Sequence, residues 1–257
     1  MTTTERASDD TIELAHNIAK ELSTPFVPRS NKTIRALQKT HDAETIIVVG
    51  PSDIRLLSEG QPPLFFHPSM ALVRIKRLRD GGTDSLLRAS GATLGDHVLD
   101  CTAGLCSDSL VFSYAVGDQG KVIALEASAV LHAVIREGLQ SYETGLPDID
   151  HAMRAIKPLH EDHDQYLRQL DNNSMDIVYF DPMFEKPVTT SSSLVPLRSF
   201  ACKQTLTEES IQQAVRVARK AVVLKERRNS EHFARLGFHN IHTSATSIAY
   251  GVIRIDS

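Results

Sequence analysis

Short apolar runs in the last two thirds of the chain alternate with longer stretches in which apolar residues recur at helical spacing. Each run has the length of a buried strand, and each longer stretch has the periodicity of an amphipathic helix. The predicted strands are 97–100, 121–126, 156–160, 175–180, 221–226, 238–243 and 247–255, and the predicted helices are 83–90, one beginning near Asp108, 129–142, 162–170, 207–219 and 230–236. Strands separated by helices favour a mostly parallel, Rossmann-like α/β sheet covered on both faces. No helix separates the last two strands, so the final strand is predicted to be antiparallel.

The first 80 residues have the pattern of a separate, smaller α/β unit. An apolar stripe predicts a helix over 9–22, and Pro25 and Pro28 prevent its continuation. A short helix over 33–40, a strand over 44–50 and a strand–turn–helix over 64–82 follow. The pair Gly81-Gly82 is the predicted boundary, which gives a small N-terminal domain at 1–80 and a larger domain at 81–257.

Composition narrows the class of protein. With 41% hydrophobic and 23% charged residues, the 257-residue chain is typical of a globular protein. A net charge of −4 argues against nucleic-acid binding through bulk charge, but leaves room for a local basic patch. The three cysteines have no metal-ligand spacing, and His160 and His163 are not placed on one helical face, so no metal site is expected. Neither a membrane span nor a secretory signal is visible, which predicts a cytoplasmic protein.

Acidic residues recur where four predicted strands end. Asp100, Glu126 and Asp181 each stand within one or two residues of the last apolar position, and the remaining strand end carries Glu161 and Asp162. Any one of them alone could be a solvated loop carboxylate. Because ligands in open parallel sheets bind at the carboxyl ends of the strands, the four together predict a binding site at this edge.

The loop after the first of these strands narrows the ligand. Asp100 is followed by Thr102, Ala103 and a single glycine, Gly104, which fits neither the G-x-G-x-x-G fingerprint nor a phosphate-binding P-loop. An acid beside such a turn suits a ligand with a cationic amine and no phosphate. Glu126 could accept both ribose hydroxyls, and Asp162 an adenine amino group. An amine, a ribose diol and an adenine without phosphates describe S-adenosylmethionine.

The segment DPMF (181–184) indicates the reaction. Methyltransferases that act on exocyclic amines of bases carry an [NDS]-P-P-[FYW] motif at this place. The polar side chain and the proline carbonyl there accept hydrogen bonds from the amine, and the aromatic ring stacks on the base. Asp181, Pro182, Met183 and Phe184 are therefore the predicted catalytic residues, with Met183 in place of the second proline. The alternative is a strand-terminating turn followed by a core phenylalanine.

The chain resembles the RsmJ family of S-adenosylmethionine-dependent methyltransferases. The likeness lies in DCTAGLCSD (100–108), LEAS (125–128), PLHEDH (158–163) and VYFDPMF (178–184), and it extends over roughly residues 60–257. Members methylate N2 of a guanine in small-subunit ribosomal RNA. The resemblance implies a class I methyltransferase fold, S-adenosylmethionine as cofactor and ribosomal RNA as partner. The N-terminal unit is more similar to uncharacterised relatives from Gram-positive bacteria.

Carried over position by position, the family's cofactor residues fall on Ser107, Asp108, Glu126, Ala127, Asp162, His163 and Asp181. Met183 matches the family. Where the family usually reads G-L-G-R-D, however, this chain has Gly104-Leu105-Cys106-Ser107-Asp108, so Ser107 replaces an arginine. This departure bears on the RNA target rather than on the cofactor.

Basic residues near the predicted cleft are candidates for substrate phosphates. They are Arg74, Arg77, Arg198 and Lys225; Arg74 and Arg77 could equally belong to a solvated helix face. Two rival functions stay open. One is methylation of a small molecule or protein, and the other is a degenerate relative that binds RNA without catalysis. The methyl acceptor and the oligomeric state are not specified by the sequence.

Overall fold

The computed structural model describes residues 1–182, 200, 205–243 and 246–255, and these form two compact units. Unit 1 contains Met1–His67 and Ser128–Glu143. Unit 2 contains Pro68–Ala127 and the described residues of Thr144–Pro187 and Cys202–Ser257. Met183, Phe184 and Arg198, which the sequence assigned to the site, lie outside the described residues.

Within its described residues, unit 1 has a four-stranded sheet and three helices. The strands follow the order β1 (Thr2–Thr3), β2 (Thr45–Val49), β3 (Ile54–Ser58), β4 (Leu64–Phe65); β1 pairs in parallel with β2, and the other pairs are antiparallel. Its helices are α1 (Asp9–Glu21), α2 (Ile34–His41) and α6 (Ala129–Ser141). Helix α1 begins where Ser8 Oγ accepts a hydrogen bond from the Thr11 backbone N–H, at 3.3 Å.

Helix α6 belongs to unit 1 although it is distant from the rest of that unit in sequence. Its Gly138 lies so close to Phe66 that an added Cβ would stand 2.2 Å from the phenylalanine side chain. Arg136 on the same helix donates to both carboxylate oxygens of Glu21, at 2.8 and 2.9 Å. The missing side chain at position 138 therefore permits the close packing of α6 within this unit.

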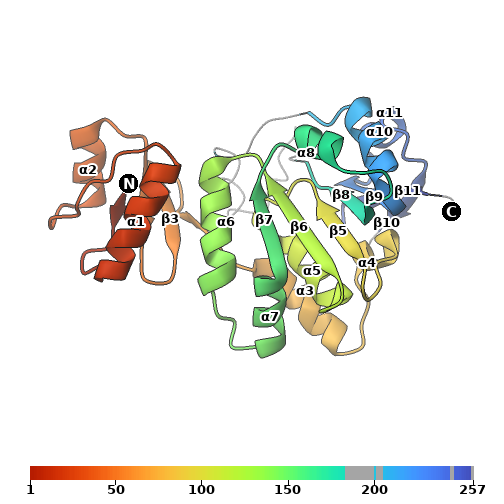
Figure 1. The fold of residues 1–257 in the computed structure, drawn as a ribbon, viewed down its shortest axis with the longest axis horizontal. Helices are drawn as coiled ribbons and strands as arrows, with labels where there is room; N and C mark the ends of the chain where they lie inside the picture. The colour runs from red at the N-terminus through yellow and green to blue at the C-terminus, as the bar shows by residue number, and fades with distance from the viewer. Residues whose placement is uncertain (183–199, 201–204, 244–245, 256–257) are drawn as a thin grey trace. The chain divides into compact units, whose positions relative to one another are not determined.

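Unit 2 is built on a seven-stranded sheet with the order β10-β11-β9-β8-β5-β6-β7 (Figure 1). The strands are β5 (His97–Asp100), β6 (Lys121–Glu126), β7 (Ile156–His160), β8 (Met175–Phe180), β9 (Ala218–Arg227), β10 (Asn240–Thr243) and β11 (Ile248–Arg254). Strands β5 to β9 are parallel, whereas β11 is antiparallel to both β9 and β10. The predicted parallel sheet with an antiparallel final strand is confirmed.

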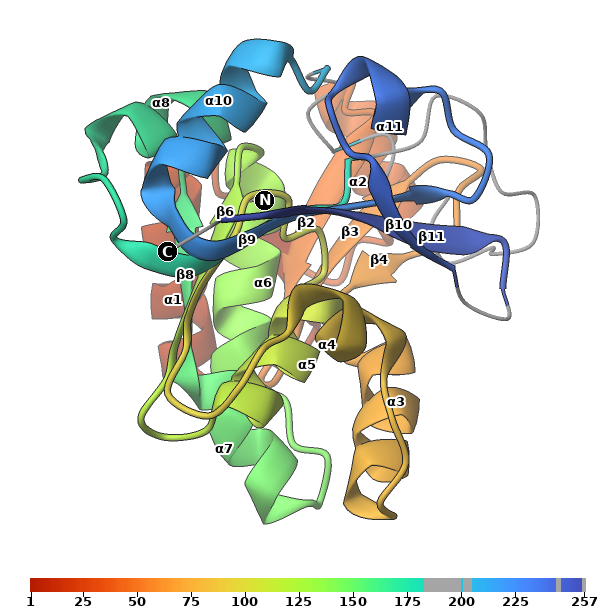
Figure 2. The ribbon, with the colours of Figure 1, turned by 90° about the vertical axis from the view of Figure 1, so that its right-hand side faces the viewer.

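Helices cover both faces of this sheet (Figure 2). On one face lie α8 (His163–Gln169), α10 (Glu208–Val217) and α11 (His232–Arg235), and on the other α3 (Ser69–Arg79), α4 (Ser85–Ser90), α5 (Ser107–Val116) and α7 (Pro147–Ala155). Alternate strand residues such as Leu99, Val178 and Val222 share a buried apolar cluster with Ile211 and Phe233 from the first group. The packing fixes the strand ends, where the site lies.

Some elements were not predicted from the sequence. Strands β1 and β3 and helix α7 fall in stretches that the sequence reading left without a strand or helix. The boundary predicted at Gly81-Gly82 stays a prediction, although the contacts group α3 with unit 2, where it packs on α5. None of the helices in the described ranges is both long and apolar enough to span a bilayer.

Candidate active site

The site is defined by the point where the strand order of unit 2 reverses. From β5 the chain continues to β6 and β7 on one side, and it then returns to place β8 on the other side of β5. The carboxyl ends of β5 and β8 therefore diverge into connections on opposite sides, which leaves a crevice for a ligand. Asp100 ends β5, Glu126 ends β6 and Asp181 follows β8.

Asp100 is a buried carboxylate held from two sides. Its Oδ1 accepts a hydrogen bond from the Thr102 backbone N–H at 3.1 Å, and its Oδ2 accepts one from Ser109 Oγ at 2.5 Å. Only 1% of the residue is exposed. Burial raises the pKa of Asp100 to about 7, although the hydrogen bonds from Ser109 and Thr102 oppose the rise. The carboxyl group can therefore change its protonation state near neutral pH.

The loop that follows Asp100 is a tight turn into helix α5. Gly104 has φ +52°, and the Cys106 backbone N–H donates to the Ala103 carbonyl at 2.7 Å. Cys106 itself has φ +57°, a conformation that costs a side-chain-bearing residue energy. No side chain caps the helix that begins at Ser107. The turn thus brings bare backbone to the strand end, as a closely bound ligand requires.

Asp108 is the centre of a charged cluster. Its Oδ1 accepts from Arg74, and its Oδ2 accepts from Tyr179 Oη at 2.7 Å and from Lys225 Nζ at 2.8 Å. Arg74 also forms two hydrogen bonds to Asp84, at 2.8 and 2.9 Å. Burial alone would raise the pKa of Asp108, but Lys225 and Arg74 outweigh it and hold this pKa well below its ordinary value. Asp108 is therefore a fixed anion.

Lys225 links this cluster to Asp181. Its Nζ donates to Asp181 Oδ2 at 2.7 Å, while the Asp181 backbone N–H donates to Thr102 Oγ1 at 2.5 Å. Burial raises the pKa of Asp181 to about 6; Lys225 opposes the rise, and the charge of Asp108 adds to it. Its side chain is 28% exposed, and its Oδ1 has no hydrogen-bond partner within the described part of the chain. One carboxylate oxygen is thus held and the other is available.

The other predicted cofactor residues line the adjoining strand ends. Glu126 is buried at the end of β6, and Ala127 follows it, with the Ala127 carbonyl 3.2 Å from His160 Nε2. Asp162 caps α8 by accepting from the Gln165 backbone N–H at 3.0 Å, and it stays partly exposed. His163 is buried edge-on against Phe180, with ring centroids 5.8 Å apart.

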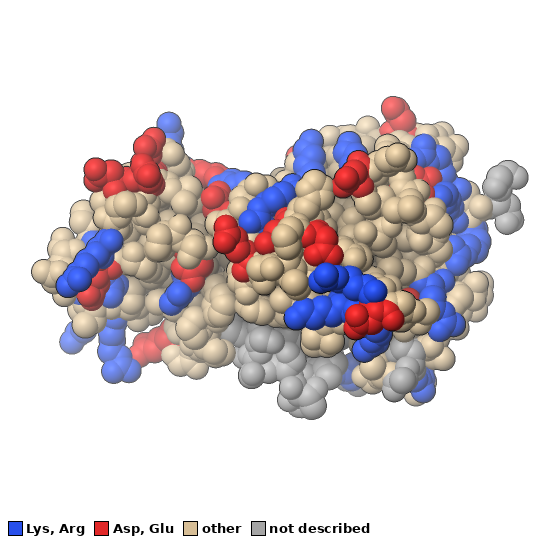
Figure 3. Space-filling model, turned by 90° about the horizontal axis from the view of Figure 1, so that it is seen from below, with Lys and Arg blue, Asp and Glu red and all other residues tan. Residues whose placement is uncertain are grey.

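The predicted substrate-binding cations divide into two kinds. Arg74 and Lys225 are paired with carboxylates, and their side chains are only 16% and 20% exposed. Neither charge is therefore available to a substrate phosphate. Arg77 is exposed on α3. Figure 3 shows that on the face it draws, Lys and Arg side chains are interspersed with Asp and Glu. That face offers small basic groups rather than one continuous basic surface.

Three residues of this network were missed in the sequence reading. Ser109 binds Asp100, Tyr179 binds Asp108, and Asp84 binds Arg74. Asp84 had a detectable signal, because an aspartate before an apolar helical stretch is a typical N-cap, and here it accepts from the Leu86 backbone N–H at 2.9 Å. Tyr179 had no such signal, because a tyrosine within an apolar run is usually a residue of the hydrophobic core. Within the described residues, no cluster of ligating side chains could hold a metal ion.

Comparison with known proteins places the chain in a family. The family model described as "Putative SAM-dependent methyltransferase" matches residues 32–247. A Bacillus subtilis protein, named "Uncharacterized protein YpiP", is 41% identical over 254 residues, which cover 99% of this chain and 98% of that protein. Ribosomal RNA small subunit methyltransferase J of Hydrogenovibrio crunogenus is 28% identical over 155 residues, 58% of this chain and 55% of that enzyme.

The fold has a solved counterpart in a crystal structure of an S-adenosylmethionine-dependent methyltransferase from Neisseria gonorrhoeae. The TM-score is 0.66 at 20% identity, and the match covers 99% of this chain and 95% of that one. The site's chemistry fits the cofactor of such proteins: buried carboxylates suit a ligand with an amine, a sulfonium and ribose hydroxyls, and Gly104 allows close approach. The chain therefore belongs to the S-adenosylmethionine-dependent methyltransferase family, and S-adenosylmethionine is its cofactor.

Proposed function

We propose that the protein transfers a methyl group to an exocyclic amine of guanine in ribosomal RNA. The observation that carries this proposal is the carboxylate of Asp181, which has one oxygen held by Lys225 and one available at the switch point. The DPMF sequence and the likeness to ribosomal RNA methyltransferases named above give further support.

The cofactor residues are assigned by the chemistry of each strand end. Glu126 would accept the ribose hydroxyls, and Asp162 the adenine amine. Asp100, with Thr102, Ala103 and Gly104, would surround the methionine end; the backbone around Ser107 and Ala127 would complete the walls. Asp108 and His163 are buried, so each supports the site from behind rather than from a free surface.

Asp181 would orient the acceptor amine. S-adenosylmethionine, when bound, supplies an electrophilic methyl group on a sulfonium, which ends as a neutral thioether. The free Asp181 oxygen accepts one amine hydrogen, and the Pro182 carbonyl accepts the other. These hydrogen bonds raise the electron density on nitrogen and aim its lone pair at the methyl carbon. As the new N–C bond forms and the S–C bond breaks, the surplus proton passes to Asp181 or to water.

Lys225 and Arg74 serve this arrangement as positioning residues. Lys225 fixes the Asp181 carboxylate, Asp108 fixes Lys225, and Arg74 with Tyr179 fixes Asp108. A chain of charge-assisted hydrogen bonds of this kind restricts the rotamer of its last member. Of the predicted substrate cations, Arg77 is then the described residue that stands free for a phosphate.

A second candidate function is methylation of a small molecule or a protein. Ser107, where the resembled family has arginine, favours it, because a cation is missing from the loop between β5 and α5. Both candidates require the same cofactor site, so the acceptor must be tested separately.

Calorimetric titration with S-adenosylmethionine tests the cofactor residues. We expect Glu126→Ala and Asp100→Ala each to weaken binding about tenfold or more, as the loss of charge-assisted hydrogen bonds implies. Wild-type affinity in both variants would contradict the assignment.

Mass mapping of ribosomal RNA from cells with and without the gene tests the acceptor. We expect one N2-methylguanine to be absent without the protein. Asp181→Asn should lower turnover on small ribosomal subunits about 100-fold with little change in cofactor affinity, whereas Asp171→Asn, an exposed aspartate before β8, should leave turnover unchanged. Unaltered ribosomal RNA in the deletion strain would favour the second candidate.

A further inference from the structure

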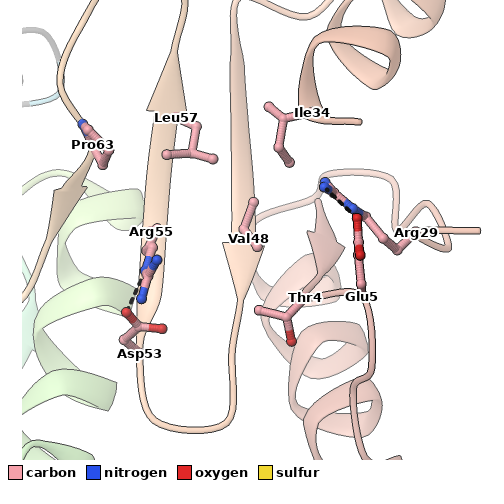
Figure 4. Close-up of a pocket in the computed structure, with 9 residues that line it drawn as sticks. All are labelled: Thr4, Glu5, Arg29, Ile34, Val48, Asp53, Arg55, Leu57 and Pro63. Carbon is pink, nitrogen blue, oxygen red and sulfur yellow. Dashed lines mark hydrogen bonds and ion pairs between the residues drawn. The ribbon is translucent and has the colours of Figure 1, made fainter. Parts of the chain in front are cut away.

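Unit 1 contains a pocket of its own. It has a volume of 230 Å³ and lies over β2 and β3, between the segment after β1 and the start of α2 (Figure 4). Apolar side chains form its floor, and charged side chains stand at its margins; the lining residues are Thr4, Glu5, Arg29, Ile34, Val48, Asp53, Arg55, Leu57 and Pro63. Pockets for drug-sized ligands span about 300–1,000 Å³, so this one suits a smaller group, such as part of a nucleotide.

Arg29 is poorly satisfied within the described structure. Its Nε and Nη1 atoms are buried and have no hydrogen-bond partner there, and its Nη2 lies 3.8 Å from Glu5 Oε1 (Figure 4). Glu5 is 65% exposed and too distant for a hydrogen bond, so it neutralises Arg29 only weakly. A guanidinium with two idle donors is costly unless an acceptor reaches it. Because the side chain is 15% exposed and lines the pocket, an anion in the pocket could pair with its charge.

Arg55 also lines the pocket, but unlike the Arg29 side chain it already has a hydrogen-bond partner. Its Nε donates to Asp53 at 2.6 Å, so its charge is already paired. Arg55 lies opposite Val48 on β2 and opposite Phe65 on β4, and directly opposed residues of antiparallel strands share a face. Phe65 is 40% exposed. A flat aromatic surface thus stands on the same face of the sheet as the pocket.

We propose that this face of unit 1 binds single-stranded RNA, with a phosphate on Arg29 in the pocket and a base stacked on Phe65. The inference rests on the proposed RNA substrate and adds a second contact region to it. Arginine forks match phosphate oxygens, and aromatic rings on a sheet face stack bases without sequence preference. An acidic peptide could satisfy Arg29, but it would leave the exposed ring without a planar partner.

The test measures binding of a fluorescent single-stranded RNA oligonucleotide to the full chain by anisotropy, as a function of salt. Arg29→Met should weaken binding about tenfold and reduce the slope of log Kd against log salt by about 0.7, the value for one phosphate contact on a single strand. Phe65→Ala should weaken binding about fivefold or more without changing this slope. The control is Arg35→Met on the exposed side of α2, which removes the same charge away from the pocket and should change Kd less than twofold.

Folding and function are monitored separately. The Arg29 side chain has no hydrogen bond to lose in the described structure, so Arg29→Met should unfold at the same or a higher denaturant concentration and should bind S-adenosylmethionine as the wild type does. Equal effects of Arg29→Met and Arg35→Met would overturn the site, as would wild-type binding to polyglutamate as tight as to RNA, or no binding to RNA. If Arg29-dependent binding persists while no RNA is methylated, the site stands and the proposed acceptor falls.

Discussion

Lys225 is the residue on which the charged cluster depends, because among the described residues it is the cation that contacts both Asp108 and Asp181. Replacing Lys225 with methionine keeps the apolar stem and leaves two carboxylates facing each other. We expect the free energy of unfolding at pH 7 to fall by about 3 kcal/mol, the lower end of the cost of breaking a buried pair. The loss should shrink as the pH falls, because Asp181 then takes up a proton. Urea unfolding measures it.

Arg168→Met is the control for this prediction. Arg168 Nη2 lies 2.8 Å from Glu209 Oε1, and the two side chains are 54% and 64% exposed. Removal of such a surface pair should cost about 1 kcal/mol or less. Equal losses in the two variants would show that the Lys225 cluster is not a buried, interdependent unit.

The contribution of Asp100 to folding stability should change with pH in the direction opposite to that of a paired surface carboxylate. Its pKa of about 7 lies above the ordinary value of 3.8, so between these pH values the folded state binds more protons than the unfolded state. Stability from this group therefore falls as the pH rises from about 4 to 7. Asp100→Asn removes the titration, and its stability relative to the wild type should improve by about 1 kcal/mol per pH unit between pH 5 and 7.

Asp176→Asn provides the comparison for this prediction. Hydrogen bonds from Arg219 and the His97 backbone hold the pKa of Asp176 below its ordinary value despite burial. Its contribution is already complete above the unfolded-state pKa, so Asp176→Asn should lose stability by an amount that is constant from pH 5 to 7. Unfolding curves of the three proteins at several pH values test both statements. A constant difference for Asp100→Asn would contradict the buried titration.

At the scale of elements, the packing of α6 in unit 1 depends on Gly138. Alanine would favour the helix by about 1 kcal/mol in the absence of neighbours. Its Cβ would stand 2.2 Å from Phe66, however, and overpacking of this kind costs about 1–3 kcal/mol. We expect Gly138→Ala to lower the thermal unfolding temperature. Phe66→Leu, added to it, should recover part of the loss, and a double-mutant cycle with purely additive effects would show that the two residues do not touch.

Strands that consist of one continuous, fully buried apolar run could be predicted from the sequence. The bounds of β6 and β8 agree with those predicted, because a continuous apolar run, VIAL in β6 and IVYF in β8, is followed by an acidic residue in both. Helix α7 was missed although Ile149, Ala152 and Met153 form a buried stripe; the polar residues between them obscured the period in so short a helix. Strand β1 has two residues, too few for any pattern.

The acids at the strand ends could be predicted because the register of a parallel sheet brings them to one edge. The partners of Arg74 and Lys225 could not. Lys225 meets Asp108 across 117 positions of sequence, and Arg74 meets it across 34. From the sequence alone, a lysine or arginine is expected to lie on the surface. Only the tertiary fold shows that it is buried and which carboxylate it pairs with.

At the scale of the whole molecule, the division into two compact units predicts that the cofactor stabilises unit 2 and not unit 1. A ligand at 100 times its Kd stabilises the unit that binds it by about 2.7 kcal/mol. We expect S-adenosylmethionine to slow amide hydrogen exchange in β5, β6 and the turn at Thr102–Ser107, and to leave β2 and β3 of unit 1 unchanged. Mass spectrometry of exchanged peptides measures this. Equal slowing in both units would mean that they unfold as one.

The carboxylate cluster has a consequence for the end of the catalytic cycle. Arg74 and Lys225 face three carboxylates, those of Asp84, Asp108 and Asp181, so the group carries one uncompensated negative charge. If S-adenosylmethionine binds here as proposed, its sulfonium would offset this charge. After transfer the thioether is neutral, and the offset is lost once the surplus proton has left Asp181 for water. The spent cofactor would then be held less firmly than the fresh one, which would promote exchange of product for substrate.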